Sequence, residues 1–233
     1  MKESSLTSVT DEAQSGGIRA AVLGINEGLV TNVSLILGVA AGTSNVAIVK
    51  LAGLASLVAG ACSMAVGEYV SMQAQVELLQ RVLATVRRSF GDEGERLEGL
   101  RRAFACEGLS PQAAAAAAED LGDDHTRSIE LYSRAVLGIN PGELGSPWVA
   151  ALASLVTFAI GAALPLLPWY FAGVDRAPYV SLGFAFVAAF VIGAMLGHHT
   201  NRKWFAGGVR QVIVVAIASA ITYGAGRLVG VRV

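Results

Sequence analysis

The chain has 233 residues, of which 54% are hydrophobic and 15% are charged, and its formal net charge at pH 7 is −1. Soluble domains carry about 25% charged residues, so this composition excludes an ordinary soluble protein, and the near-neutral charge gives no indication of a nucleic-acid partner. The apolar residues are gathered into long blocks. Because about 20 apolar residues in a helix span the hydrocarbon core of a bilayer, we predict an integral membrane protein of the all-α class.

The first 17 residues, MKESSLTSVTDEAQSGG, are mostly polar and lack the apolar core of a signal peptide. We expect residues 1–17 to form a disordered tail and the first apolar block to remain in the mature chain. Five blocks are long enough to cross a bilayer, and they predict five transmembrane helices. These helices cover residues 18–42, 46–72, 148–172, 178–198 and 209–229.

The basic residues are distributed unevenly between the two sides of the predicted spans. Thirteen lie in the N-terminal region, in residues 73–147 and around residues 199–210, and four lie on the opposite side. Because cytoplasmic loops are rich in lysine and arginine, we expect the N-terminus in the cytoplasm and the C-terminus outside. The predicted organisation is helices 1–2 in residues 18–72, a cytoplasmic helical domain in residues 73–147 and helices 3–5 in residues 148–233.

The first predicted span, LGINEGLVTNVSLILGVAA, contains a carboxylate at Glu27. Thr31 and Ser34 follow it at i+4 and i+7, so the three side chains are expected on one helical face. Small residues are expected near the same side, at Gly24, Gly28 and Gly38. Such a face suits a water-filled path or a close helix contact, and not lipid.

The second predicted span, GLASLVAGACSMAVGEYVSM, contains the other acidic residue of the spans, Glu68, with Met64 four residues before it. A thioether beside a carboxylate suits Fe²⁺ or Mn²⁺ better than Mg²⁺ alone, and carboxylates also exchange metal for protons. Two interpretations stay open. In the first, these acids mark an ion pathway, as intramembrane acids do by default. In the second, Glu27 is paired with an arginine or hydrogen-bonded to Asn26 or Asn32 and only fixes helix packing.

Residues 73–147 interrupt the apolar pattern with 12 acidic residues and 8 arginines. The second span continues without a helix breaker to Gly91, which favours one helix through both regions. Three further helices are predicted, and Ser110 and Pro111 are the N-cap and first residue of the middle one. Their sequences are DEGERLEGLRRAFACE, the alanine-rich stretch after Ser110, and DDHTRSIELYSRAVLG, with Ile129, Tyr132 and Val136 on one stripe of the last.

The remaining motifs do not indicate catalysis. Pro165 and Pro168 predict a kink or an irregular end in the third span. The two cysteines, Cys62 and Cys106, lie on separate predicted elements and form no disulfide or zinc pattern. Since no nucleotide loop, catalytic triad or HExxH motif is present, we do not expect an enzyme.

Two segments, RAAVLGINEGLVTNVSLILGVAAG and LAGLASLVAGACSMAVGEYVSMQAQ, together resemble the first two helices of the vacuolar iron transporter family. The resemblance extends to SPWVAALASLVTFAIGAALPLLPW in the third span and to the arrangement of five helices with an insert. It implies a homodimer with an iron path between the subunits, driven by proton exchange. Glu27 takes the place of the aspartate in the family's N-D-G motif, and Met64 and Glu68 match its SMAxGE motif.

The resemblance is weaker in the insert, where members that store iron carry repeated glutamates on three cytoplasmic helices. Glu95 and Glu98 match one such pair, but the preceding helix lacks acids between Val82 and Ser89, and Arg134 stands where a glutamate is common. This difference makes manganese, or a broader range of divalent ions, as much an expectation as iron.

The sequence therefore predicts a proton-coupled transporter that exports Fe²⁺, Mn²⁺ or both from the cytoplasm. Glu27, Met64 and Glu68 would bind the ion, Asn26 and Thr31 would support them, and Glu95 with Glu98 would form a cytoplasmic metal site. The expected partners are a divalent metal ion, protons, the bilayer and a second copy, with no permanently bound cofactor. Composition favours a bacterial cell membrane, or the vacuolar membrane in a eukaryote. The alternative is a non-transporting membrane scaffold or metal sensor of the same fold.

Overall fold

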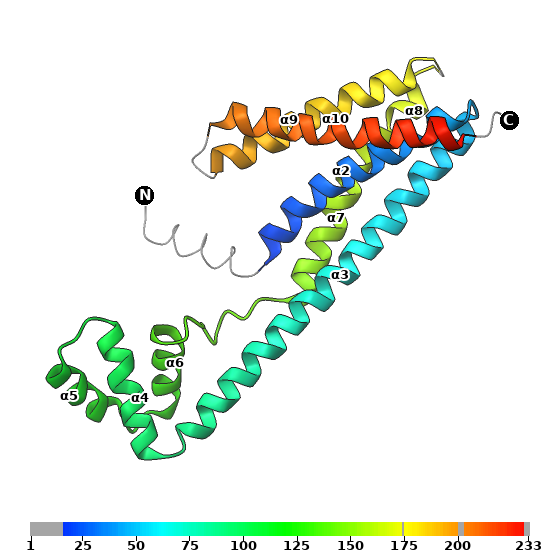
Figure 1. Ribbon diagram of the computed structural model, residues 1–233. Coiled ribbons are helices and arrows are strands. Elements are labelled where there is room, and N and C mark those ends of the chain that lie inside the picture. Colours follow the sequence, from blue (N-terminus) through cyan, green and yellow to red (C-terminus); the bar gives the residue numbers. More distant parts are fainter. Residues whose placement is uncertain (1–15, 174, 200–202, 231–233) are drawn as a thin grey trace. The chain divides into compact units, whose positions relative to one another are not determined.

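The computed structural model describes residues 16–173, 175–199 and 203–230, so the tail expected in residues 1–17 lies almost entirely outside it (Figure 1). Helices and connecting turns, without any strand, make up this part of the chain. It divides into two compact units. The membrane unit comprises Gly16–Tyr69 and the chain from Trp148 onward, and the insert unit comprises Val70–Pro147.

Within the described residues, five helices are long and apolar enough to cross a bilayer, as predicted. The fifth begins five residues earlier than expected, so Arg210 lies inside a helix and not in the preceding loop. The helices of the membrane unit are α2 (Gly17–Gly42), the first part of α3 (Val46–Ser89), α7 (Pro147–Leu166), α8 (Pro168–Phe171), α9 (Ala177–His199) and α10 (Trp204–Val229).

The break between α7 and α8 confirms the irregular end predicted from the prolines. Pro168 has no N–H to donate to the carbonyl four residues before it, which ends α7 at Leu166. In the same last turn of α7, the carbonyl oxygen of Pro165 accepts a hydrogen bond of 2.6 Å from Ser181 Oγ on α9. The broken end of one span is thereby attached to the next.

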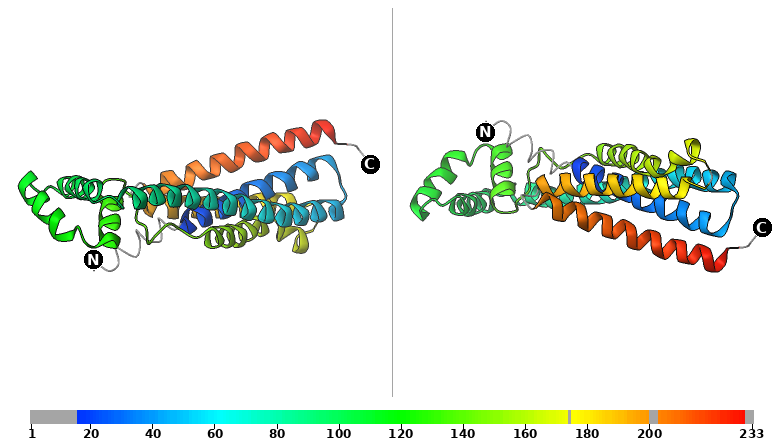
Figure 2. Two further views of the ribbon diagram at one scale, coloured as in Figure 1. Left: turned by 90° about the horizontal axis from the view of Figure 1, so that it is seen from below. Right: turned by 90° about the horizontal axis from the view of Figure 1, so that it is seen from above.

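Glycine allows the helices of the membrane unit to approach one another closely. A Cβ at Gly28 of α2 would overlap the carbonyl oxygen of Phe158 on α7, and one at Gly161 of α7 would overlap the carbonyl oxygen of Ile25. Gly38 of α2 and Gly226 of α10 make a similar backbone contact, and Figure 2 shows α10 along one edge of the bundle beside α2. Van der Waals packing of small residues therefore holds this unit together, as is typical within a bilayer.

The insert unit contains the end of α3 followed by α4 (Glu93–Cys106), α5 (Pro111–Leu121) and α6 (His125–Ala135). The predicted continuity of α3 is confirmed, although it ends at Ser89, two residues before Gly91. Side chains cap each of the three following helices, and the Ser110 cap and Pro111 start were predicted. The caps are Asp92 on the N–H of Glu95, Ser110 on that of Ala113 and Asp124 on that of Arg127. On α6, the predicted stripe of Ile129, Tyr132 and Val136 is half-buried, and Ser128 and Ser133 are the fully buried residues.

Candidate functional site

Glu27 lies well inside the first apolar helix and faces outward. It follows the first residue of α2 by ten positions, which places it about 15 Å along the helix axis. Its side chain is exposed, and it forms no hydrogen bond or ion pair with any residue that the structure describes. Asn26, Asn32 and the described arginines therefore do not compensate its charge, contrary to what the structural interpretation of this residue requires.

Glu68, the second intramembrane acid, is buried and paired. Its side chain is 9% exposed, and its Oε2 atom lies 3.3 Å from Nη2 of Arg19, a side chain that is 59% exposed. Sequence analysis missed Arg19 as a partner, because 49 residues separate it from Glu68. An arginine in the first turn of an apolar helix is the one signal that could have suggested it.

Two contacts fix the register of α2 and α3. Arg19 is beside Glu68, and a Cβ at Gly53 would lie 3.0 Å from Cδ1 of Ile36, so the two helices run antiparallel. With equal rise per residue, Glu27 lies level with about residue 60 of α3, and the levels of Glu27 and Glu68 differ by about 12 Å. Within one chain the two acids therefore form successive positions along the span and not a single coordination site.

Met64 lies between these two levels. It is half-buried and packs against the cluster formed by Ala61 of α3 and Phe158 and Ala162 of α7. As predicted, it precedes Glu68 by one helical turn on α3. Along the helix axis, Met64 therefore lies between the levels of the two carboxylates.

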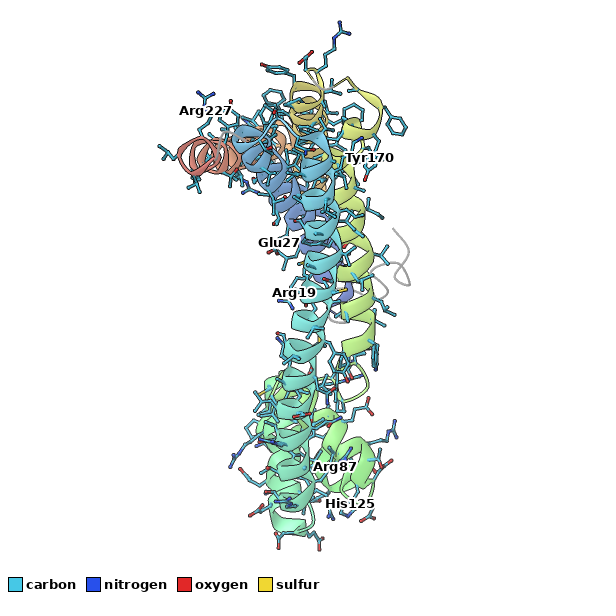
Figure 3. All side chains as sticks on the ribbon, turned by 90° about the vertical axis from the view of Figure 1, so that its right-hand side faces the viewer. Arg19, Glu27, Arg87, His125, Tyr170 and Arg227 are labelled. Carbon is cyan, nitrogen blue, oxygen red and sulfur yellow. The ribbon has the colours of Figure 1, made fainter. Side chains whose placement is uncertain are left out.

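Arg19, Leu23, Glu27 and Thr31 recur at every fourth residue of α2 and are all exposed. We call these four residues the exposed α2 face. Figure 3 shows Arg19 and Glu27 one above the other on the same side of the helices. This face presents one cation, one anion and one hydroxyl in an otherwise apolar helix, which is a chemical composition suited to water or ions and unsuited to lipid.

Part of the predicted polar face of α2 is wrong. Ser34 is buried, and Gly24 and Gly28 pack against α7 instead of lining the face that bears Glu27. Gly28 directly follows Glu27 and is therefore about 100° around the helix from the carboxylate, whereas Ser34 shares the side of Glu27 but is covered by its neighbours. Asn26 also has a packing partner, because its Oδ1 accepts a hydrogen bond from Gln211 of α10.

Glu95 and Glu98 lie on the solvated side of α4 in the insert unit, and both are exposed. Glu98 Oε1 is 3.3 Å from Nε of Arg102, one turn along the same helix. Within residues 16–173, 175–199 and 203–230, no group of three or more His, Cys, Asp or Glu side chains is placed to hold a metal ion. The structure therefore brings no third ligand to this pair.

Comparisons with known proteins agree with one another over nearly the whole chain. The model of the VIT family matches residues 18–227. The vacuolar iron transporter homolog 1 of Oryza sativa subsp. japonica is 34% identical over 229 residues, covering 94% of this chain and 77% of the rice protein. The vacuolar iron transporter homolog 3 of Arabidopsis thaliana is 33% identical, with 91% and 83% coverage, and the vacuolar iron transporter 1 of Oryza sativa subsp. japonica is 26% identical, with 92% and 86% coverage.

Proposed function

This chain belongs to the VIT family, a family of membrane transporters and not of enzymes, and we propose that it exports Fe²⁺, Mn²⁺ or both from the cytoplasm in exchange for protons. The observation that carries the proposal is Glu27, an exposed carboxylate without a protein partner among the described residues of a membrane-spanning helix. Such a group costs several kcal/mol in lipid, so it persists where water, a cation or a proton compensates its charge.

The proposed path is completed by a second copy of the chain. In a single copy the exposed α2 face would place Glu27 and Thr31 against acyl chains, which is unfavourable. An isologous contact about a twofold axis would bring this face of one subunit close to the same face of the other. Glu27 from each subunit would then line one water-accessible route, with four carboxylate oxygens available to an ion.

The side chains along the proposed route suit a borderline divalent ion. Glu27 and Glu68 offer hard oxygen ligands, and Met64 offers a soft thioether, a mixture that favours Fe²⁺ or Mn²⁺ over Mg²⁺. Both carboxylates also bind protons, so protons entering from the far side would displace the metal and complete the exchange. Ligands at successive levels bind an ion less tightly than a closed cage would, which favours release.

The distribution of basic residues supports the proposed direction. Lysine and arginine are concentrated in the N-terminal region, the insert and the loop before the fifth span, which supports a cytoplasmic location for all three. Glu68 lies two residues before the insert unit begins at Val70, and it would therefore be at the cytoplasmic end of the route. Transport toward Glu27 would carry metal out of the cytoplasm, across a bacterial cell membrane or into a vacuole.

Metal flux into proteoliposomes tests the proposal. The parent chain should take up Fe²⁺ or Mn²⁺ under an imposed pH gradient, and Glu27→Gln, which keeps the shape and removes the charge, should lower the rate about tenfold or more. Glu119→Gln, at an exposed position of α5, is the matched control and should retain the parental rate. Normal flux in a Glu27→Gln, Glu68→Gln double variant would contradict the proposed path. A folded parent that moves neither ion under any gradient would favour the scaffold or sensor.

A further inference from the structure

Resting on the proposed function, we infer that Arg19 is a built-in counter-ion that competes with the transported cation for Glu68. In the metal-free protein the guanidinium of Arg19 is paired with the carboxylate of Glu68. Metal arriving at Glu68 displaces the guanidinium, and the guanidinium displaces the metal again when the ion moves on. Arg19 would thereby set both the affinity and the release rate at the cytoplasmic end of the route.

The two partners of this ion pair differ in their freedom to move. Glu68 is 9% exposed, and a buried ionised carboxylate that loses its partner is strongly unfavourable, so it needs either a cation or a proton at all times. Arg19 is 59% exposed and sits on a long flexible stem, so its head can leave Glu68 for water or headgroups at little cost. The pair is therefore built with a fixed anion and a removable cation.

The contact with Arg19 uses one carboxylate oxygen of Glu68 and leaves the other for an incoming ion. Only Oε2 of Glu68 is paired with Arg19, and Oε1 has no hydrogen-bond partner within the described part of the chain. Arg19 makes this single contact at 3.3 Å and no other hydrogen bond to a described residue. A two-point guanidinium clamp would be much harder to displace, so the geometry favours exchange over permanent pairing.

No other described cation can take this role. The remaining lysines and arginines that the structure describes in the membrane unit form no ion pair with Glu68, and they lie at other positions of the chain. They are Lys50, Arg176, Lys203, Arg210 and Arg227. Removing the charge of Arg19 should therefore leave Glu68 without a cationic partner among the described residues, so that a metal ion binds there without competition from a guanidinium.

The first test separates binding from transport. Equilibrium binding of Mn²⁺ to the purified protein in detergent is followed by the electron paramagnetic resonance signal of the free ion, and flux is measured in proteoliposomes. Arg19→Gln should lower the dissociation constant about three- to tenfold and also lower the maximum flux, because release is no longer assisted. Arg19→Lys, which keeps the charge, should stay within about twofold of the parent in both measurements.

A double-mutant cycle links the effect to Glu68. In a Glu68→Gln background, the additional Arg19→Gln change should no longer alter the dissociation constant, because the carboxylate for which Arg19 competes is absent. A persisting increase in affinity would assign the effect to general electrostatics and overturn the inference. Unchanged or weaker Mn²⁺ binding by Arg19→Gln would overturn it as well, since a guanidinium that positions Glu68 for the metal predicts weaker binding.

A second measurement needs no variant and is therefore independent of folding defects. Phenylglyoxal modifies free guanidinium groups, and mass spectrometry reports the modification of Arg19 in the parent. The addition of Mn²⁺ should increase the modification rate of Arg19 several-fold and leave that of Arg102 unchanged. If bound Mn²⁺ does not change the rate at which phenylglyoxal modifies Arg19, the inference is overturned.

These outcomes are distinguishable from failure of the proposed function. A parent that transports metal, but in which neither the Arg19 variants nor the modification rate of Arg19 behaves as expected, leaves the proposed function intact. A parent without flux contradicts the proposed function itself.

Discussion

Each of the two units contains one charged residue that is buried among the described residues, and the two are held in different ways. Glu68 in the membrane unit pairs with an opposite charge, Arg19. Arg96 in the insert unit is 7% exposed, and its Nη1 instead donates to the carbonyl oxygen of Phe90 at 3.2 Å and lies 3.1 Å from Nε2 of His125. The counter-ion proposed at Glu68 would permit exchange, whereas a backbone carbonyl of the same unit holds the charge of Arg96 in place.

The exposed charges of the two units also differ. In the insert unit they form ion pairs on helix surfaces, where water screens them and each pair contributes little. Examples are Glu98 with Arg102, Glu130 with Arg134 and Glu119 with Arg101. In the membrane unit Glu27 is exposed without a partner among the described residues, in an apolar helix. The same side chain is therefore ordinary in one unit and a candidate for function in the other.

The largest expected effect comes from the packing that supports the membrane unit. Gly28→Ala would press a Cβ into the backbone of Phe158 on α7, and we expect a destabilisation on the order of 3 kcal/mol. Thermal unfolding of the detergent-solubilised protein, followed by size-exclusion chromatography, measures this loss of stability.

Gly183→Ala on α9 is the matched control. Its Cβ meets nothing within 4 Å, so the gain in helix propensity should leave stability equal or slightly higher. Equal melting temperatures for both variants would contradict this account of the packing.

A smaller and more local effect is expected at Arg96. Arg96→Ala removes the donor to Phe90 and leaves a buried carbonyl unsatisfied, which should cost the insert unit about 2 kcal/mol. Hydrogen exchange of the full-length protein, read by mass spectrometry on peptides from α4 and α6, should show faster exchange there and no change in α2 or α10. Arg102→Ala, which removes an exposed arginine from the same helix, should change these rates little. Uniformly faster exchange in both units would contradict an insert-specific role.

Sequence analysis predicted the elements well because each depends on local chemistry. Hydropathy determines the five spans, and Ser110 before Pro111 defines a helix start whatever lies around it. The third span, with its two prolines, likewise has a local reason to end where it does. These features needed no knowledge of which helix lies beside which.

The arrangement of the candidate site could not be predicted in the same way. Met64 and Glu68 were placed correctly relative to each other, because both lie on one helix. The pairing of Glu68 with Arg19, however, depends on the register of α2 against α3, and the backbone contacts of Gly24 and Gly28 depend on α7. A helical period shows which residues share a face, but it does not show what that face meets.

The smallest effect is expected where the insert carries its acidic pair. Glu95→Ala with Glu98→Ala removes two exposed carboxylates, one of them in an i,i+4 pair with Arg102 that contributes about 0.5 kcal/mol or less. Flux of Fe²⁺ and Mn²⁺ at saturating metal should stay within about twofold of the parent, because two carboxylates alone hold a divalent ion weakly and no described residue is placed beside them as a third ligand. Flux measured at low metal concentration shows whether the insert collects metal for transport. A collecting site would reveal itself there as a raised half-saturating concentration with an unchanged maximum rate, and that result would restore a metal-gathering role to the insert. Parental kinetics at low metal would instead restrict the metal chemistry to the membrane unit, which contains Glu27 and Glu68.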